Sequence, residues 1–179
     1  MRRNCKEGRT IDYLYNTLLI SEGGIMDICI KKGTLEYLKD CEEALINSEL
    51  GRKYFVNEGS GKKAILEGLE HETLYIALIN DICVGFIWYL PKGAFHSFPY
   101  LHIISVKEEY RSKGIGKKLI DFFEDIVFVN ASKIFLVVAD FNPDAKRLYE
   151  KIGYRKVGEI PSLYRKGITE YLMMKEKEI

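Results

Sequence analysis

A segment of strand, glycine turn and helix over residues 100–127 constrains the fold of this chain more than any other. The β-rich run YLHIISV is followed by YRSKGIGKKL (110–119), which holds two glycines and four cations. Apolar residues then recur at helical spacing as far as residue 127. A strand that turns through glycines into a helix presents free backbone N–H groups and the positive end of the helix dipole at one point. The segment therefore predicts an anion site suited to a phosphate or pyrophosphate.

The rest of the pattern predicts further strands and helices in a regular order. The strand IFLVV (134–138) follows the glycine-led helix, so these elements form a βαβ unit. The runs TLYIALI and CVGFIWYL meet at Asn80 and Asp81, which predicts a hairpin. The other expected elements are a strand at 26–33, a helix capped by Thr34 and ending near Leu50, a helix after Ser60, a loop at 91–99, a helix at 142–152, and strands at 154–160 and 168–175.

Composition limits the classes of function. The 179 residues suffice for one domain with a substantial core. With 27 basic and 26 acidic side chains the net charge is +1, so no global field attracts nucleic acid or an anionic membrane. The longest apolar run, 82–90, has about half the length that a membrane-spanning helix needs. We therefore expect neither a nucleic-acid partner nor a membrane partner.

The spacing of cysteines and histidines predicts a reduced, metal-free protein. The four cysteines form no C-x-x-C pair, and the three histidines match no metal-ligand spacing. These residues are Cys5, Cys29, Cys41, Cys83, His71, His96 and His102. A cytoplasmic location follows as the expectation.

Residues 1–25 are expected to be an N-terminal extension. Asp12 and Asn16 interrupt its apolar part and no small-residue cleavage site follows, which argues against a secretory signal. The segment SEGGIM can be encoded by a purine-rich run containing GAGGGAGGT just upstream of an ATG codon. We therefore expect translation to start at Met26, and the apolar spacing before it to be fortuitous or only marginally helical.

Two common phosphate motifs do not fit the glycine turn. The Walker pattern needs glycine where the chain has Arg111, and serine or threonine where it has Lys118. The dinucleotide fingerprint needs glycine or alanine where the chain has Leu119. A turn that merely shapes the chain, with solvated lysines, is the structural alternative.

The turn resembles the pyrophosphate loop of the GNAT superfamily of acetyl-CoA-dependent N-acetyltransferases. That loop has the pattern R/Q-x-x-G-x-G/A, matched by Arg111, Gly114 and Gly116. The segment NPDAKRLYEKIGYRKVG (142–158) resembles the second hallmark of the superfamily, N-x-x-A-x-x-L-Y-E-K-x-G-[FY]. The matching residues there are Asn142, Ala145, Leu148, Tyr149, Glu150, Lys151, Gly153 and Tyr154.

The resemblance implies an α/β (α+β) fold in a single N-acetyltransferase domain, residues 26–179. Its central sheet would be mixed and mostly antiparallel, with six to seven strands and about four flanking helices. The sheet would splay between its fourth and fifth strands, where the coenzyme enters. Acetyl-CoA is thus the implied co-substrate, with no metal. Dimers are common in the family, so a homodimer is compatible with the resemblance.

The resemblance also assigns residues to the coenzyme. The fourth strand would pair its backbone with the pantetheine amides, and backbone N–H groups of the turn would wrap the pyrophosphate. The implied cofactor-binding residues are Ile104, Ser105, Val106, Arg111, Ser112, Lys113, Gly114, Ile115, Gly116, Lys117, Asn142, Lys146 and Tyr149. Asn142 precedes Pro143, which also suits a helix N-cap.

Acetyl transfer needs a neutral amine and a proton for the departing thiolate. Tyr149 matches the tyrosine that acts as general acid in many members of the family, although Ala145, Leu148 and Ile152 already define an inward helix face on which a tyrosine can simply pack. His102 is the candidate base because imidazole titrates near neutrality, with Glu108, Glu170 and a water chain as alternatives, or with His102 as a structural residue.

The acceptor is less determined by the sequence. The implied reaction moves acetyl from acetyl-CoA to a small-molecule or peptide primary amine by direct attack, and the alternative is an acyl-CoA-binding sensor or complex subunit without turnover. Certain protein N-terminal acetyltransferases carry a glutamate in the fifth strand, whereas FLVVAD has no acid before Asp140. Candidates for the walls of the acceptor groove, each equally compatible with the core, are Tyr54, Phe55, Trp88, Phe95 and Phe98.

Overall fold

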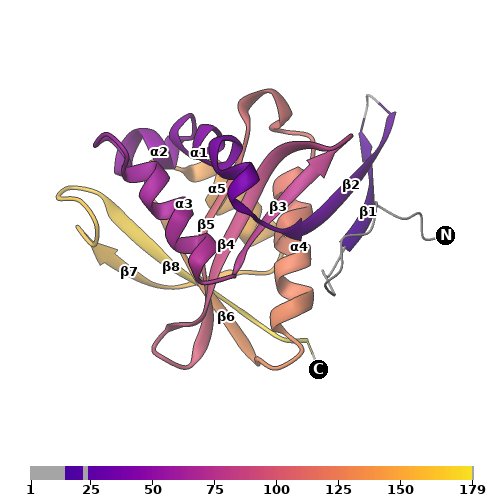
Figure 1. Ribbon diagram of the computed structural model, residues 1–179. Helices are drawn as coiled ribbons and strands as arrows, with labels where there is room; N and C mark the ends of the chain where they lie inside the picture. The colour runs from indigo at the N-terminus through magenta and orange to yellow at the C-terminus, as the bar shows by residue number, and fades with distance from the viewer. Residues whose placement is uncertain (1–14, 22–23, 179) are drawn as a thin grey trace.

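A computed structural model of the protein describes residues 15–21 and 24–178. These residues form one mixed sheet in the order β1-β2-β3-β4-β5-β6-β8-β7 (Figure 1). The strands are β1 (Tyr15–Ser21), β2 (Gly24–Lys32), β3 (Leu74–Ile79), β4 (Ile82–Ala94), β5 (Phe98–Val106), β6 (Lys133–Ala139), β7 (Arg155–Pro161) and β8 (Thr169–Glu176). The helices are α1 (Leu38–Ile46), α2 (Glu49–Tyr54), α3 (Ser60–Glu70), α4 (Ile115–Val127) and α5 (Pro143–Lys151), with 3-10 turns η1 (Leu35–Tyr37) and η2 (Glu108–Tyr110).

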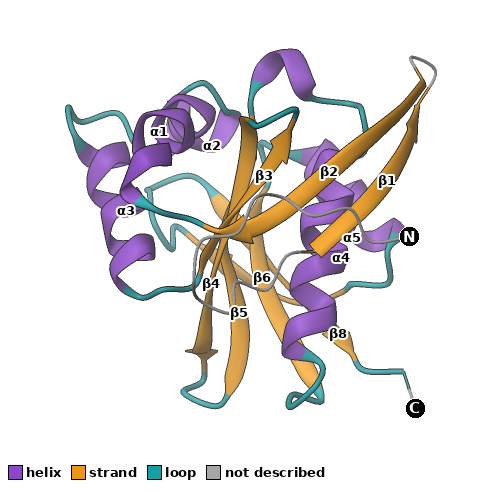
Figure 2. Cartoon of the chain, turned by 45° about the vertical axis from the view of Figure 1, so that its right-hand side comes forward, coloured by secondary structure: helices purple, strands orange, loops and turns teal. Residues whose placement is uncertain are grey.

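Helices cover both faces of the sheet. Figure 2 shows α1, α2 and α3 on one side and α4 and α5 on the other. Beneath α1 and α3 the core is built around Phe86, Trp88 and Ile103, whereas the opposite core includes Leu119 and Phe123 of α4. Alternate residues of a strand point to opposite faces, so each central strand supplies both cores. The expected α/β architecture is confirmed, with eight strands instead of six to seven and five α-helices instead of about four.

The sheet opens between β5 and β6. These two strands are parallel and pair only through Tyr100 with Phe135 and Leu101 with Leu136. The remaining neighbours in the sheet are antiparallel and pair over longer stretches, including seven residue pairs between β6 and β8. Beyond Leu101 the two strands diverge and leave a wedge. Counted from Met26 they are the fourth and fifth strands, so the expected splay is confirmed.

Strand β1 lies within the segment expected to be a leader. It pairs antiparallel with β2 at the sheet edge, the Tyr15 ring packs on Phe122 at 5.6 Å, and the Thr17 hydroxyl accepts a hydrogen bond from Lys118. Its apolar residues are therefore in a strand, not in a marginal helix. Residues 1–14 and 22–23 lie outside the described residues, and a translation start at Met26 stays a prediction.

The single helix expected from Thr34 to near Leu50 is divided in two. The α1 helix ends at Ile46, and Ser48 caps α2 by accepting a hydrogen bond from Gly51 N at 2.9 Å. The Ser48 hydroxyl also donates to Leu45 O at 2.6 Å. Serine competes well for backbone partners at helix starts, which the apolar periodicity alone does not reveal.

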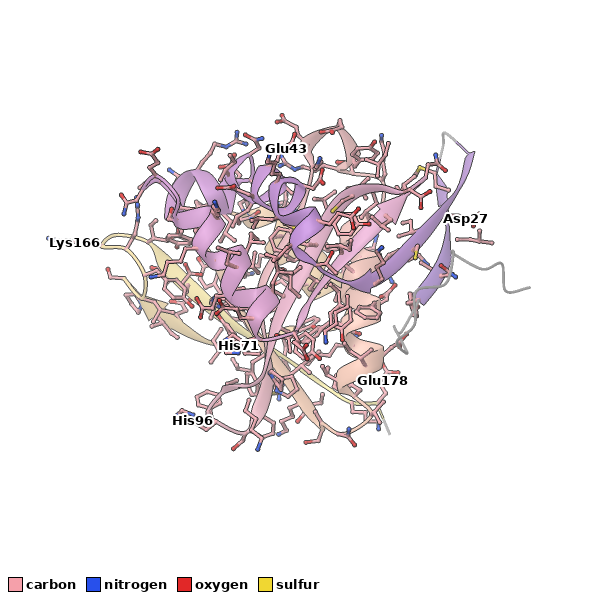
Figure 3. The ribbon with its side chains drawn as sticks, viewed as in Figure 1. Asp27, Glu43, His71, His96, Lys166 and Glu178 are labelled. Carbon is pink, nitrogen blue, oxygen red and sulfur yellow. The ribbon has the colours of Figure 1, made fainter. Side chains whose placement is uncertain are left out.

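The expected loop at 91–99 is mostly strand. β4 continues to Ala94 and β5 begins at Phe98, which leaves a three-residue turn where Phe95 and His96 adopt positive φ angles of 53° and 54°. Pro91 and Pro99, the two ends of the expected loop, lie inside the strands of this long hairpin. Figure 3 shows His96 at its tip, at the opposite end of the molecule from Glu43 on α1.

Gly85 keeps β4 and β5 in close contact beside the wedge. A Cβ at this position would lie 2.7 Å from the carbonyl oxygen of Ser105, which is backbone and cannot swing aside. We expect Gly85→Ala to lower the free energy of unfolding by about 1–3 kcal/mol through overpacking, measured by urea denaturation. Gly116→Ala is the control, because a Cβ there meets nothing within 4 Å. Equal stability of the two variants would contradict this reading of the β4–β5 contact.

Candidate functional site

The wedge between β5 and β6 holds a cavity of about 360 Å³. Its walls come from the diverging strands, α2, the start of α5 and the loop between β7 and β8. The lining includes Tyr54, Phe55, Tyr100, His102, Phe141, Asn142, Tyr149, Tyr164, Arg165 and Glu170. Segments that are distant in sequence therefore meet around one space, which is the usual situation of a ligand site.

A β-bulge shapes one wall of this cavity. Trp88 pairs with Ile103 while the next residue, Tyr89, pairs with Leu101, so His102 is an extra residue in β5. A bulge bends its strand and redirects a side chain. Here it occurs next to the last β5–β6 pair, at Leu101, and it therefore coincides with the point where the sheet opens.

His102 is half-buried in the wall against Trp88. The two rings are 4.5 Å apart and meet edge to face, and the His102 Nδ1 atom is buried without a hydrogen-bond partner among the described residues. Burial lowers the pKa of His102 below its ordinary value of 6.5. The imidazole is therefore neutral at pH 7 and can accept a proton.

Tyr149 lines the cavity from α5. Its side chain is buried against the core, its ring is 5.7 Å from that of Tyr154, and its hydroxyl has no hydrogen-bond partner within the described residues. Burial raises the pKa of Tyr149 well above the ordinary value for tyrosine. The phenol thus keeps its proton at neutral pH and is available as a donor.

The glycine turn forms the start of α4. Gly114 adopts a φ of 83°, which favours glycine, and Ser112 adopts a φ of 60°. The first helical hydrogen bond runs from Lys118 N to Gly114 O, so the N–H groups of Ile115, Gly116 and Lys117 have no acceptor within the helix. Together with the helix dipole these groups favour an anion at this point, and the binding of a diphosphate there stays a prediction.

Gly116 provides a test of whether a ligand fits there. This residue lies in the first turn of α4 with an ordinary φ, and an added Cβ would meet no atom within 4 Å. Glycine costs about 0.5–1 kcal/mol in a helix relative to alanine, so the fold itself gives no reason for it. Open space above exposed N–H groups fits a diphosphate that must approach the backbone closely.

The charged side chains of this region are engaged with the protein. Arg111 donates from Nε to Val106 O at 3.0 Å and from Nη2 to Asn47 O at 2.9 Å. Lys113 donates to Glu109 O, Lys117 pairs with Asp121, and Lys146 pairs with Glu150. The guanidinium of Arg111 thus ties the end of β5 to the segment after α1, a structural role that its place in the motif does not reveal.

The other predicted cofactor residues lie on β5 and at or within α5. Ile104 and Val106 pack towards the α4 core, while the Ser105 hydroxyl donates to Ala44 O of α1 at 2.6 Å. Asn142 caps α5 by accepting a hydrogen bond from Ala145 N at 3.3 Å, with Pro143 in the first turn, so its predicted capping role is confirmed.

The predicted acceptor residues divide into two groups. Tyr54 and Phe55 line the cavity. Trp88 lies in the core beneath α1 and α3, and Phe95 and Phe98 pack on Phe135 at the far hairpin, so none of these three belongs to the lining. Phe95 and Phe98 are predicted as wall residues from a loop at 91–99, but the extension of β4 to Ala94 carries this segment to the far hairpin.

Sequence reasoning did not identify three aromatic residues of the cavity, Tyr100, Phe141 and Tyr164. The Tyr100 and Tyr164 hydroxyls are 3.2 Å apart although 64 positions separate them. No spacing rule signals such a pair. Their position next to a strand end or in a loop between strands was the available hint.

Among the alternative bases, Glu170 belongs to the cavity and Glu108 does not. Glu170 of β8 is 2% exposed and accepts a hydrogen bond from the Tyr54 hydroxyl. Burial raises the pKa of Glu170, although the bond from Tyr54 opposes this effect. Glu108 is exposed in η2, outside the lining.

Neither a cluster of metal ligands nor a membrane-spanning helix occurs among the described residues. Within residues 15–21 and 24–178, no three histidine, cysteine, aspartate or glutamate side chains are grouped as metal ligands. In the same part of the chain, no helix has the length and apolarity needed to cross a membrane.

Comparison with known proteins places this geometry among acyl-group transferases. Residues 38–154 match the protein family described as "Acetyltransferase (GNAT) family". An N-alpha-acetyltransferase of Saccharolobus solfataricus is 30% identical over 112 residues, and an uncharacterized N-acetyltransferase of Methanocaldococcus jannaschii is 40% identical over 107 residues. These matches cover 56% and 58% of this chain. The chain spans 67% and 65% of those two proteins, and 27% of a matched protein of Mycobacterium leprae.

Solved structures agree on the fold. Arabidopsis thaliana Naa50, in complex with the bisubstrate analogue CoA-Ac-MVNAL, superposes with a TM-score of 0.65 at 24% identity. The superposition covers 84% of this chain and 99% of that one.

The open space at Gly116 predicts that alanine at this position stabilises the fold but weakens the binding of coenzyme A. We expect Gly116→Ala to raise the free energy of unfolding by about 0.5–1 kcal/mol and Gly116→Val to remain folded. Both should weaken binding of coenzyme A, the valine variant more, because a side chain occupies the diphosphate position. Urea denaturation and calorimetric titration measure the two effects. Undiminished affinity in Gly116→Val would refute the assignment.

The burial of His102 predicts its titration. Because the charged form is disfavoured in the wall, we expect the imidazole signal to titrate below 6.5 in an NMR pH series. His102→Gln identifies the signal by removing it. A midpoint at or above 6.5 would show that the ring is better solvated or better partnered than this structure indicates.

Proposed function

Since this chain belongs to the acetyltransferase (GNAT) family, we propose that it transfers an acetyl group from acetyl-CoA to a primary amine. The observation that carries the proposal is the cavity between β5 and β6, which is lined by Tyr149, whose hydroxyl has no hydrogen-bond partner within the described residues. The anion site lies at the start of α4, the helix that follows β5. A proton donor and a diphosphate site at one strand opening match the needs of thioester transfer.

Coenzyme A binding is assigned to the edge of β5 and the start of α4. The backbone at 104–106 has no strand partner on the β6 side and is free to pair with pantetheine amides. The N–H groups of the turn, from Arg111 to Lys117, would receive the diphosphate. Acetyl-CoA supplies an activated acetyl group as a thioester.

The protein then provides the proton transfers. The acceptor ammonium loses one proton to become a nucleophile, its nitrogen forms a bond with the acetyl carbon, and it loses a second proton as the amide forms. The carbon–sulfur bond breaks, and Tyr149 donates a proton to the thiolate. With Tyr149 reprotonated, the balance is one amide, one thiol and one proton released to solvent.

His102 is the proposed acceptor of the amine proton. It lines the same cavity as Tyr149, it lies on the bulge, and its lowered pKa keeps it neutral before the reaction. Amine pKa values lie well above neutrality, so a neutral base at this position aids formation of the nucleophile.

A peptide amine is the proposed acceptor class. A matched archaeal relative is an N-alpha-acetyltransferase, and the analogue bound to Naa50 contains the peptide MVNAL. For this chain, the wedge continues past Tyr149 to α2 and to the β7–β8 loop, which leaves room for a residue beyond the amine.

A cytoplasmic location and self-association are part of the proposal as well. Cys41 and Cys83 are buried and form no disulfide within the described residues, which suits a reducing compartment. Sedimentation of the full chain tests whether it forms a homodimer.

The test of the proposed function compares Tyr149→Phe with the unchanged protein. We expect release of free thiol from acetyl-CoA to depend on an amine, and kcat to fall roughly a hundredfold in the variant. The affinity for coenzyme A should stay the same by calorimetry, because the phenol acts on the sulfur during the reaction. Unchanged turnover in Tyr149→Phe would remove this residue from the chemistry. Tight coenzyme binding without turnover across a broad amine panel would instead support the alternative function, an acyl-CoA-binding protein that does not catalyse transfer.

A further inference from the structure

The inner end of the acceptor cavity carries a buried acidic side chain. Glu170 lines it while only 2% of its surface is exposed, and the Tyr54 hydroxyl donates to one carboxylate oxygen. Asp140 lies close enough to raise the pKa of Glu170 by repulsion, and its own Oδ2 accepts a hydrogen bond from Thr169 N at 3.0 Å. A desolvated carboxylate with one hydrogen bond is stabilised by an incoming cation.

Aromatic rings surround this carboxylate. The Tyr54 ring lies 5.6 Å from Phe141 and 5.6 Å from Tyr164, and the Tyr164 hydroxyl lies 3.2 Å from that of Tyr100. Ring faces attract ammonium groups, and more strongly where water is excluded. A carboxylate within an aromatic enclosure is therefore suited to the protonated amine of the acceptor.

The outer end of the same cavity is positively charged. Lys53 precedes Tyr54 and Arg165 follows Tyr164, and the rings of these two tyrosines lie 5.6 Å apart, so the backbones of both cations lie near this contact. Lys53 Nζ lies 5.9 Å over the Phe141 ring, and Arg165 is a lining residue. Figure 1 shows α2 and the β7–β8 loop on the same side of the molecule.

Neither cation is neutralised by the protein. Both side chains are exposed, and within the described residues neither forms an ion pair. The neighbouring Arg52, by contrast, pairs with Glu49 at 3.4 Å. Unpaired cations beside a buried carboxylate give the entrance a polarity that a bound molecule can match.

From this arrangement we propose that the acceptor is the N-terminus of a peptide whose next residues are acidic. Its ammonium group would lie against Glu170 in the aromatic enclosure, and its side-chain carboxylates would lie between Lys53 and Arg165. Polycationic amines would bring positive charge against the same two residues and be disfavoured. The reaction in this inference rests on the proposed acetyl transfer. The charge preference rests instead on the side chains of the cavity and would remain without turnover.

The test uses two peptides that differ only in charge, Ala-Glu-Glu-Leu amide and Ala-Arg-Arg-Leu amide. Arginine replaces lysine so that the N-terminus is the one acceptor amine in each peptide. We expect kcat/KM for the acidic peptide to be higher by at least about fivefold. The double variant Lys53→Glu with Arg165→Glu should invert this preference.

Two further variants separate the parts of the proposal. Lys166→Glu makes the same charge change on the same loop, but Figure 3 shows Lys166 at the loop tip pointing away from the body, and it is not a lining residue. In Lys166→Glu, the ratio of kcat/KM for the acidic peptide to kcat/KM for the basic peptide should stay within about twofold of the ratio in the unchanged protein. Glu170→Gln should raise KM for both peptides and leave their ratio unchanged, with coenzyme A affinity as the measure of intact folding.

The outcomes are distinguishable from failure of the proposed function. Equal kcat/KM for the two peptides, an unchanged ratio in the double variant, or better use of spermidine than of the acidic peptide would overturn the inference while acetyl transfer stands. Absence of turnover with every amine would overturn the proposed function. In that case calorimetric titration of both peptides onto the coenzyme A-saturated protein still measures the preference, and equal affinities would overturn it.

Discussion

The site depends on two neighbouring strands that stop pairing halfway along their length. In a sheet interior, backbone N–H and C=O groups without partners are costly, so an opening of this kind persists only if something else satisfies them. β5 and β6 share two residue pairs and then diverge. Their free edges face the cavity, and a ligand with amide groups along its length can take the place of the missing strand. The separation of these strands is thus both the main structural irregularity and the basis of the proposed activity.

Each wall of the opening is held by its own support. On the β5 side, Lys107 is nearly buried between Asp40 at 2.7 Å and Glu43 at 2.8 Å, which ties the end of the strand to α1. Burial by itself would lower the pKa of Lys107, but the two carboxylates outweigh it and raise the pKa, so the ammonium stays charged. Arg111 adds bonds to Val106 O and Asn47 O. The β6 wall is instead fixed by seven residue pairs with β8. Because the supports are separate, the walls need not meet.

The sequence indicates the proposed coenzyme end of the site more completely than the proposed acceptor end, for a physical reason. The turn from Arg111 to Lys117 is contiguous, and its glycines are required locally, Gly114 by its positive φ and Gly116 by the space above the helix start. The acceptor end is assembled from α2, β5 and the β7–β8 loop, whose contacts depend on how the sheet twists. The Tyr54–Glu170 pair spans 116 positions. Likewise, the bulge at His102 arises from a shift in the pairing register between β4 and β5, and no residue of β5 by itself indicates this shift.

This division also bears on specificity. The anion site uses backbone N–H groups, which a change of side chain leaves in place provided that no Cβ fills the space at Gly116. The acceptor end uses side chains, and its outer part lies on a short helix and a loop, where substitutions cost little stability. A charge at Lys53 or Arg165 can therefore change without disturbing the cores beneath α1 and α4, whereas Glu170 lies in a strand and is almost completely buried. In the proposed acceptor site, the inner carboxylate would therefore select for an ammonium group, and the entrance would select among the molecules that carry one.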